Sequence, residues 1–136
     1  MNGIQAVTDL AVYLSKNTEI KVFKYEKQTG FNGEYLVVNS LPFSFGSAFN
    51  SQGTLNLNIH VPDLGSGLPN TKRLAEVSDM IMGLIPVSLD IEDAQPLVIN
   101  GEFYQIESDS NVMSDSDNTH FINMVIKVMF NALKTE

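Results

Sequence analysis

The chain of 136 residues is 43% hydrophobic and 18% charged, which is the composition of one folded domain with a single core and excludes an intrinsically disordered chain. Sixteen acidic residues against eight lysines and arginines give a net charge of −8, so direct nucleic-acid binding is not expected, because basic residues supply most affinity for phosphates. The chain has no cysteine, which excludes disulfides, thiolate nucleophiles and cysteine-ligated zinc.

Neither a membrane span nor a secretory leader is expected. No apolar run approaches the ~18 residues that a membrane-spanning helix needs. The first residues carry no basic leader, and Gln5, Thr8 and Asp9 interrupt their apolar pattern. We therefore expect a soluble protein of a cytoplasm.

The first predicted element is an amphipathic helix that includes residues 4–14. Its apolar residues recur at steps of three and four positions, which places them on one stripe of a helix. Asn17 and Thr18 suit its C-terminal end, because asparagine tolerates the left-handed conformation that often closes helices. The stripe consists of Ile4, Val7, Leu10, Ala11 and Leu14.

Two strands separated by a turn are predicted next. The stretch EIKVFKYEK alternates imperfectly, QTGFNG supplies glycines and an asparagine for a turn, and EYLVVNSLPF is rich in β-branched and aromatic residues. Pro42 marks the end of the second strand or a sheet edge, because proline lacks a backbone donor. Lys21, Lys24 and Lys27 form a loose basic group, but their three-residue spacing puts neighbours on opposite faces of a strand. No basic groove is expected from them.

Three phenylalanines, Phe43, Phe45 and Phe49, lie in a stretch otherwise rich in glycine and serine. Large apolar groups in such a loop are either tucked beneath it or presented to a partner. Both alternatives remain open from the sequence. The second makes these three side chains the candidate protein interface, and their replacement by serine should then reduce assembly without unfolding the domain.

The cleanest strand pattern is TLNLNIHVPD, in which apolar and polar residues alternate strictly. One face should therefore pack against the core, and the other should meet solvent or a partner. The apolar face consists of Leu55, Leu57, Ile59 and Val61, and the polar face of Asn56, Asn58 and His60.

A second amphipathic helix follows a flexible connection. Asn70 suits its N-cap, and Gly83 and Pro86 mark its end. Residues 86–96 form an acidic, weakly patterned link, which we interpret as a surface excursion with one short extended piece. The apolar stripe of this helix is Leu74, Val77, Ile81 and Leu84.

The last part of the chain is again strand-like. PLVING leads through a turn at Asn100 and Gly101 into another strand. Residues 111–120 are interpreted as a hydrated turn, because short Asp, Asn and Ser side chains bond the local backbone. Residues 121–130 are almost continuously apolar and predict a central strand under the helices.

The order helix, strands, helix, strands predicts an α+β fold. Both helices are amphipathic, and the strand connections suggest short antiparallel pairs. A mainly antiparallel sheet with two helices packed on one face buries both helix stripes and the inner sheet face at once, so a two-layer sandwich is expected. We predict a single domain over residues 1–136.

The hydrated turn also carries a partial calcium-binding pattern. Asp115, Asp117 and Thr119 give the D-x-D-x-T opening of a calcium loop. The remaining pattern does not fit, since an EF-hand needs glycine where His120 stands and a bidentate acid where Ile126 stands. A plain turn is therefore favoured over a calcium site.

His60 and His120 are the only histidines. A zinc site or a metal-dependent enzyme would require them to converge with carboxylates, which pairing of their strands would permit. A histidine on the polar face of a strand is more often simply exposed, and no nucleophile-elbow or phosphate-loop motif accompanies them. We expect no catalytic, cofactor-binding or metal-binding residues and no enzymatic activity.

Several stretches occur in an order that is typical of a known family. They are the helix IQAVTDLAVYLSKN, the strands EYLVVNSLPF and GTLNLNIHVPD, the helix NTKRLAEVSDMIMGLI and the closing MSDSDNTHFINMVIKVMF. In this pattern, most of the chain resembles the small tail-completion proteins of long-tailed bacteriophages, also called tail terminator or head-tail joining proteins, and their prophage relatives. The acidic segment 86–96 has no counterpart in the pattern.

The resemblance implies a structural protein that forms a ring, expected to be a hexamer, at the end of the tail tube. Its implied partners are copies of itself, the tail-tube protein and the head connector, in the virion tail and, during assembly, in the host cytoplasm. The alternative is a small acidic binding module, such as an inhibitor or immunity protein, that masks a basic partner by charge complementarity. Ring-shaped oligomers would favour the first function, and a stable monomer or dimer that captures a basic protein would favour the second.

Overall fold

The structure, a computed structural model of the whole chain, describes residues 2–43, 51–87, 97–115 and 118–130. Within these ranges lie two helices, α1 (Gly3–Asn17) and α2 (Thr71–Leu84), and the seven strands of one sheet. The strands are β1 (Lys21–Lys24), β2 (Tyr35–Ser40), β3 (Ser51–Pro62), β4 (Leu97–Ile99), β5 (Glu102–Asp109), β6 (Met113–Ser114) and β7 (Thr119–Phe130).

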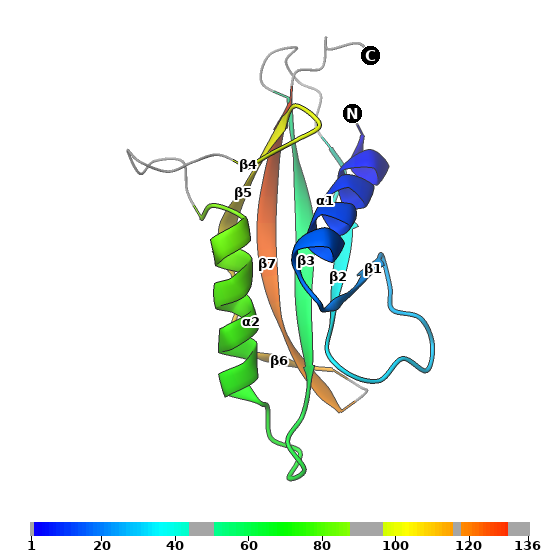
Figure 1. Cartoon of the computed structure of the whole chain (residues 1–136), viewed down its shortest axis with the longest axis vertical. Coiled ribbons are helices and arrows are strands. Elements are labelled where there is room, and N and C mark those ends of the chain that lie inside the picture. The colour runs from blue at the N-terminus through cyan, green and yellow to red at the C-terminus, as the bar shows by residue number, and fades with distance from the viewer. Residues whose placement is uncertain (1, 44–50, 88–96, 116–117, 131–136) are drawn as a thin grey trace.

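β7 occupies the centre of the sheet, as its apolar sequence predicts. The strand order is β1-β2-β3-β7-β5-β4, and β6 pairs with the first residues of β7. β3 and β7 pair over their full lengths, from Ser51 opposite Phe130 to Pro62 opposite Thr119. The two strands run side by side through the middle of the molecule (Figure 1). They form the axis around which the other elements are arranged.

β1 runs parallel to β2, whereas the other described strand pairs are antiparallel. The prediction of short antiparallel connections is wrong for this pair, because two parallel strands cannot be joined by a tight turn. Residues 25–34 carry the chain back along the sheet, so that Lys21 lies opposite Tyr35. The reversal starts at Tyr25, whose φ of 70° turns the chain while its N–H still donates to the carbonyl of Val38.

The helix ends are closed by polar side chains. Asn2 accepts a hydrogen bond from the N–H of Gln5, whose side chain accepts from the N–H of Asn2, and this capping box starts α1. The N–H and the hydroxyl of Thr18 both donate to a carbonyl in the last turn of α1. At the start of α2, Asn70 accepts from the N–H of Arg73, so the predicted N-cap is confirmed. Neither described helix is long and apolar enough to cross a membrane.

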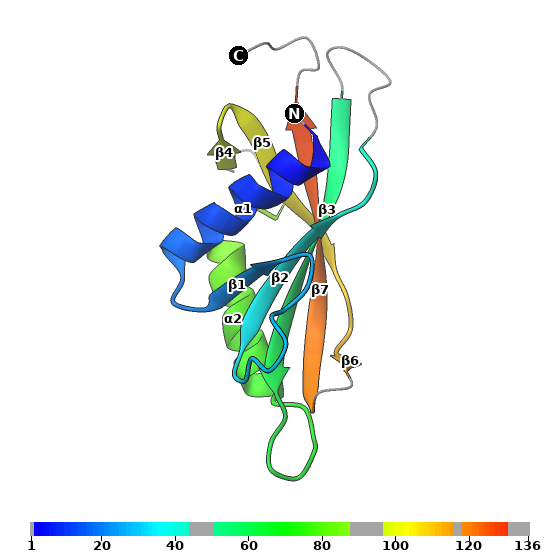
Figure 2. The ribbon, with the colours of Figure 1, turned by 90° about the vertical axis from the view of Figure 1, so that its right-hand side faces the viewer.

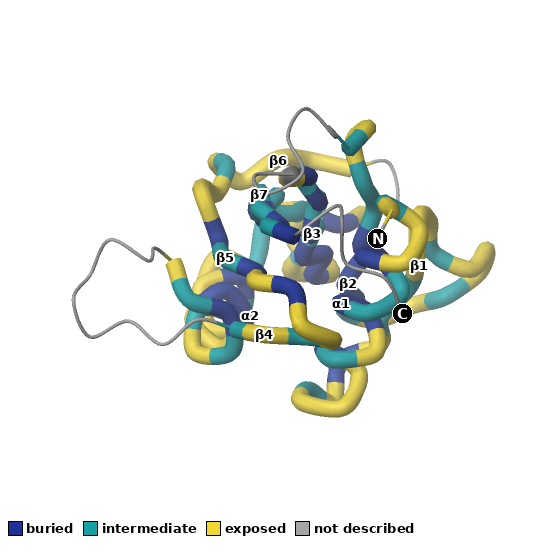
Figure 3. The backbone as a smooth tube through the Cα atoms, turned by 90° about the horizontal axis from the view of Figure 1, so that it is seen from above, coloured by how far each residue is buried: buried dark blue, intermediate teal, exposed yellow. Residues whose placement is uncertain are grey.

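α1 and α2 pack on the same face of the sheet, and their apolar stripes meet the strands in one hydrophobic core (Figure 2). The predicted alternation of β3 is confirmed, because Leu55, Leu57, Ile59 and Val61 are buried. In β7, burial alternates from Met124 to Phe130. In Figure 3 these buried positions appear dark blue along both strands and both helices. The α+β class is confirmed, although the mixed sheet is curled and does not form a flat sandwich layer. The buried strand residues are Leu55, Leu57, Ile59 and Val61 of β3 and Met124, Ile126, Val128 and Phe130 of β7.

Two turns follow α2. Asn100 and Gly101 form the predicted two-residue turn between β4 and β5, and their φ angles of 50° and 84° suit a tight hairpin. The hydrated turn predicted over residues 111–120 is shorter, because β6 lies within this range and β7 already begins at Thr119. The N–H of Asp115 donates to the carbonyl of Thr119 and closes the turn.

Candidate interaction surface

The sheet face opposite α1 and α2 is covered by no described helix, and we call it the open face (Figure 2). Its side chains are those that alternate with the core residues along each strand. Three groups of side chains lie on it: a ladder of asparagines, a stack of rings around His60, and a row of apolar side chains. Each group joins at least three strands.

The asparagine ladder crosses the open face over β2, β3 and β7. The strand register places Asn39 opposite Asn56 and, in the next row, Asn58 opposite Asn123. The amide nitrogen of Asn56 donates to the side-chain oxygen of Asn39 at 3.0 Å. The amide nitrogen of Asn123 donates to Asn58 at 2.7 Å and to Asn56 at 3.3 Å. These half-buried amides therefore satisfy one another and link three strands.

The ring stack lies beside the ladder. The His60 ring is sandwiched between Tyr35 and Phe121, with centroid separations of 4.5 Å and 4.8 Å and interplanar angles of 7° and 18°. Phe23 and Phe31 meet Tyr35 edge-on at 5.8 Å and 5.9 Å. Such ring pairs contribute roughly 0.5–1.5 kcal/mol each beyond the burial of their area. The stack therefore fixes the loop between β1 and β2 against the end of the sheet.

The His60 side chain is placed for packing. Burial lowers the pKa of His60 below its ordinary value of 6.5, Asp115 opposes this effect, and Lys27 adds to it. The Nδ1 atom lies 3.3 Å from a carboxylate oxygen of Asp115, without the alignment of a hydrogen bond. Near neutral pH the ring is therefore uncharged, which suits its place between two aromatic rings.

His60 and His120 do not converge, so the metal or acid–base interpretation of this pair is wrong. Their strands do pair, but the register puts His60 opposite Phe121 and His120 opposite Val61. Because neighbouring positions point to opposite faces, the two rings lie on opposite sides of the sheet. His120 instead bonds through Nδ1 to the carboxylate of Asp63.

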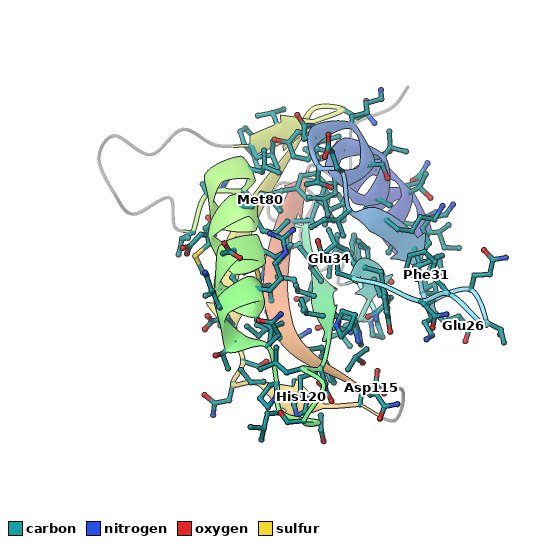
Figure 4. The ribbon with its side chains drawn as sticks, turned by 60° about the horizontal axis from the view of Figure 1, so that its bottom comes forward. Glu26, Phe31, Glu34, Met80, Asp115 and His120 are labelled. Atoms are coloured by element: carbon teal, nitrogen blue, oxygen red, sulfur yellow. The ribbon has the colours of Figure 1, made fainter. Side chains whose placement is uncertain are left out.

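The residues of the calcium-loop pattern are described in part. Asp117 lies outside the described residues, and Asp115 directs a carboxylate oxygen toward His60. Figure 4 shows Asp115 and His120 at the lower end of the sheet. Among the residues that the structure describes, no group of three or more histidine, aspartate or glutamate side chains could hold a metal ion.

The apolar row crosses the other end of the open face. Val98 of β4, Phe103 of β5 and Met129 of β7 stand in register on three neighbouring strands. Val98 is 49% exposed and Phe103 is 43% exposed, while Met129 is half-buried. Adjacent exposed apolar side chains mark contact surfaces more often than scattered ones do. This row is therefore a candidate contact surface on the open face.

Of the three phenylalanines predicted as an interface, Phe45 and Phe49 lie outside the described residues. Phe43 is half-buried and packs against the core, with its ring centroid 5.7 Å from that of Phe130. Its ring also covers Gly53 of β3. Phe43 therefore packs inward, as in the first of the two alternatives that the sequence left open. The interface role of Phe45 and Phe49 stays a prediction.

The ladder and the apolar row were not identified from the sequence as groups. The alternation of Asn56 and Asn58 along one strand was visible, but their partners Asn39 and Asn123 lie far away in the chain. Phe103 gave a signal as well, since it alternates with buried residues of β5. Only the register shows which of these side chains share a row.

Comparison with known proteins shows that another protein of solved structure has the same fold. No family model matches the chain, and the comparison with curated proteins found no match. Eight chains of solved structure match it. One of them, a protein whose name carries no functional information, has a TM-score of 0.59 and 17% sequence identity, over 93% of this chain and 92% of its own. At this identity the likeness shows that the two proteins share a fold.

Proposed function

We propose that the chain is a structural subunit that joins copies of itself into a ring, expected to be a hexamer, at the end of a phage or prophage tail. In this role it contacts the tail-tube and head-connector proteins and performs no reaction. The proposal is supported by the resemblance of its helices and strands to tail-completion proteins and by an α+β fold whose sheet is covered on one face.

The observation that carries the self-association is the apolar row of Val98, Phe103 and Met129. A helix-covered sheet with an apolar row on its other face can bury that row against a neighbouring copy. Burial stabilises by about 25 cal/mol for each Å² of apolar surface removed from water. When each copy presents different surfaces to its two neighbours, the contacts close into a ring if the rotation between copies allows it.

A second candidate function, an acidic module that masks a basic partner, is favoured by the net charge of −8. In that function the protein remains a monomer or dimer and binds one basic protein, with an affinity that falls as salt screens the charges. The oligomeric state therefore separates the two functions.

The test compares two double variants with the unsubstituted chain. V98S/F103S removes two apolar side chains from the open face, and L64S/L68S removes two leucines, 48% and 62% exposed, from the connection between β3 and α2. We expect the unsubstituted chain and L64S/L68S to form particles larger than a dimer in sedimentation and ring-shaped particles in electron micrographs. V98S/F103S should associate at least about tenfold more weakly, because hot-spot apolar residues contribute about 2 kcal/mol or more.

Two outcomes would count against the proposal. If the unsubstituted chain stays a monomer or dimer at every concentration and instead captures a basic protein, the inhibitor-like function replaces the ring. If the two double variants lose association equally, the apolar row has no special part in it.

A further inference from the structure

A groove lies away from the open face, between α1 and the edge of the sheet at β1. It has a volume of about 820 Å³. One wall is the exposed side of α1 from Thr8 to Lys16, the other is β1, and residues 26–29 of the following loop close one end. Figure 4 shows Glu26 on this loop, beyond the sheet.

The groove is basic, although the chain as a whole is acidic. Four of the eight basic residues of the chain line it, against the single acidic residue Glu26. The expectation that the lysines form no basic groove is wrong, for two reasons. Lys27 follows the turn at Tyr25, where the strand alternation ends, and α1 supplies a further lysine. The four basic residues are Lys16, Lys21, Lys24 and Lys27.

β1 offers backbone hydrogen-bonding groups along this groove. Among the described strands it pairs with β2 alone, so its other side is a sheet edge. Along a strand, successive residues direct their backbone N–H and C=O groups to opposite sides. The N–H of Tyr25 points toward β2, where it donates to Val38. The N–H and C=O of Val22 and the N–H of Lys24 therefore point away from β2, toward the free edge. The carbonyl of Lys24 already accepts from the N–H of Glu26. An added strand would therefore find donors and an acceptor here.

The floor of the groove is apolar. Ala11 and Val12 contribute from α1, and Val22 and Phe23 contribute from β1. Val12 is 46% exposed, so its side chain is available for contact. An occupant that fits would combine extended backbone, apolar side chains that reach the floor and acidic side chains that meet the lysines.

We infer that this groove binds an acidic, extended polypeptide segment of another protein, which adds to β1 as an edge strand. Lysines on an edge strand also discourage unspecific strand pairing, but Lys16 lies on α1 and has no part in that protection. A nucleic acid fits less well, because phosphates accept hydrogen bonds without donating them and a net charge of −8 repels them. The inference concerns a different surface from the apolar row and does not depend on the proposed ring.

The experiment measures binding of a fluorescein-labelled probe peptide to the full chain by fluorescence anisotropy. The probe alternates valine and glutamate and has blocked ends. A second peptide carries proline in place of alternate valines and so lacks N–H groups, and a single-stranded oligonucleotide serves as the phosphate probe. K21E/K24E reverses charge in the groove, while K72E/K127E makes the same change in net charge at exposed or half-exposed lysines outside it.

We expect the valine–glutamate peptide to bind the unsubstituted chain and K72E/K127E with closely similar affinity. Binding to K21E/K24E and binding of the proline peptide should each be at least about tenfold weaker, and added salt should weaken all binding. V98S/F103S should bind the peptide normally, which separates this surface from the proposed ring.

The inference is overturned by any of four results: no binding of the valine–glutamate peptide, equal losses in the two lysine variants, equal binding of the proline peptide, or tighter binding of the oligonucleotide. Oligomers that dissociate in K21E/K24E and persist in K72E/K127E would also overturn it, because the occupant would then be a second copy. Circular dichroism establishes that each variant is folded.

Discussion

At the scale of single residues, Tyr104 places a phenol hydroxyl in the core of the protein. The side chain is fully buried, and its hydroxyl has no hydrogen-bond partner among the described residues. Burial raises the pKa of Tyr104, and the nearby carboxylates of Asp9 and Glu102 raise it further. The hydroxyl therefore stays protonated, and the loss of its contact with water is not offset by a bond within the protein.

Tyr104→Phe should therefore raise the free energy of unfolding, by about 1 kcal/mol, because it removes an unsatisfied polar group and keeps the ring. Tyr13→Phe is the matched control: the Tyr13 hydroxyl donates to the carbonyl of Leu84 at 3.1 Å and joins α1 to the end of α2. Its removal should cost about 1 kcal/mol. Urea unfolding measures both changes, and a destabilised Tyr104→Phe would mean that the buried hydroxyl has a partner.

At the scale of elements, β3 contains a glycine that the packing of Phe43 requires. Gly53 is buried on the helix-covered face, and the ring of Phe43 lies where a Cβ atom of residue 53 would stand. The ring thereby fills the place of the missing side chain and closes the end of the core beside Phe130. The loop that follows Pro42 is thus attached to the core at its first aromatic residue.

Gly53→Ala should displace Phe43 and lower the free energy of unfolding by about 1–3 kcal/mol, because the new methyl group overlaps the ring. Gly83→Ala is the control, since a Cβ at that exposed position of α2 meets nothing within 4 Å. In a helix this change should raise stability by about 0.5–1 kcal/mol. Thermal unfolding followed by circular dichroism gives both values, and equal effects of the two alanines would contradict the packing of Phe43.

The elements themselves could be predicted because their signals are local. The stripe of α1, the N-cap Asn70 and the Asn100-Gly101 turn each depend on residues within a few positions of one another. The parallel pairing of β1 could not be predicted, because it depends on the φ of Tyr25 and on where residues 25–34 lead the chain. Strand direction is a property of the whole sheet and leaves no periodic trace.

The candidate surfaces were less predictable for the same reason. The sequence left open whether the strands of His60 and His120 pair. They do pair, but a register one residue out of step places the two rings on opposite faces of the sheet. The groove between α1 and β1 is basic because Lys16 of α1 lies beside Lys21 and Lys24 of β1. The pattern of one strand cannot predict that a helix residue lies next to it. Both surfaces arise from contacts between distant parts of the chain.

At the scale of the whole molecule, stability should depend on pH through His60. Its pKa is lowered in the folded state, so the unfolded chain takes up a proton first as the pH falls below 6.5. The stabilisation from neutral His60 is complete above pH 6.5, and it is lost progressively as the pH falls toward the pKa of His60 in the folded protein. Glu34 affects stability in a more acidic pH range. Its bidentate hydrogen bond with Arg73, at 2.8 Å and 2.6 Å, lowers the pKa of Glu34. The stabilisation from this bond is therefore lost as the pH falls below 4.5.

His60→Phe tests this dependence, because phenylalanine can occupy the place between Tyr35 and Phe121 without binding a proton. Between about pH 7.5 and about pH 5.5, the unsubstituted chain should lose more of its free energy of unfolding than the variant does. Urea unfolding at the two pH values measures the difference. Equal losses in the two proteins would show that His60 does not control stability in this range. Glu34→Gln serves as the control, since its effect belongs to more acidic solutions.

The central place of β7 has a consequence for how the molecule comes into being. β7 is the last strand of the sheet to leave the ribosome, yet it is the one that joins β3 to β5. Until Thr119–Phe130 emerges, the nascent chain holds two partial sheets that expose apolar faces and unpaired edges to the cell. The final joining step pairs residues of β3 and β7 that lie far apart in sequence, and such long-range pairing forms slowly.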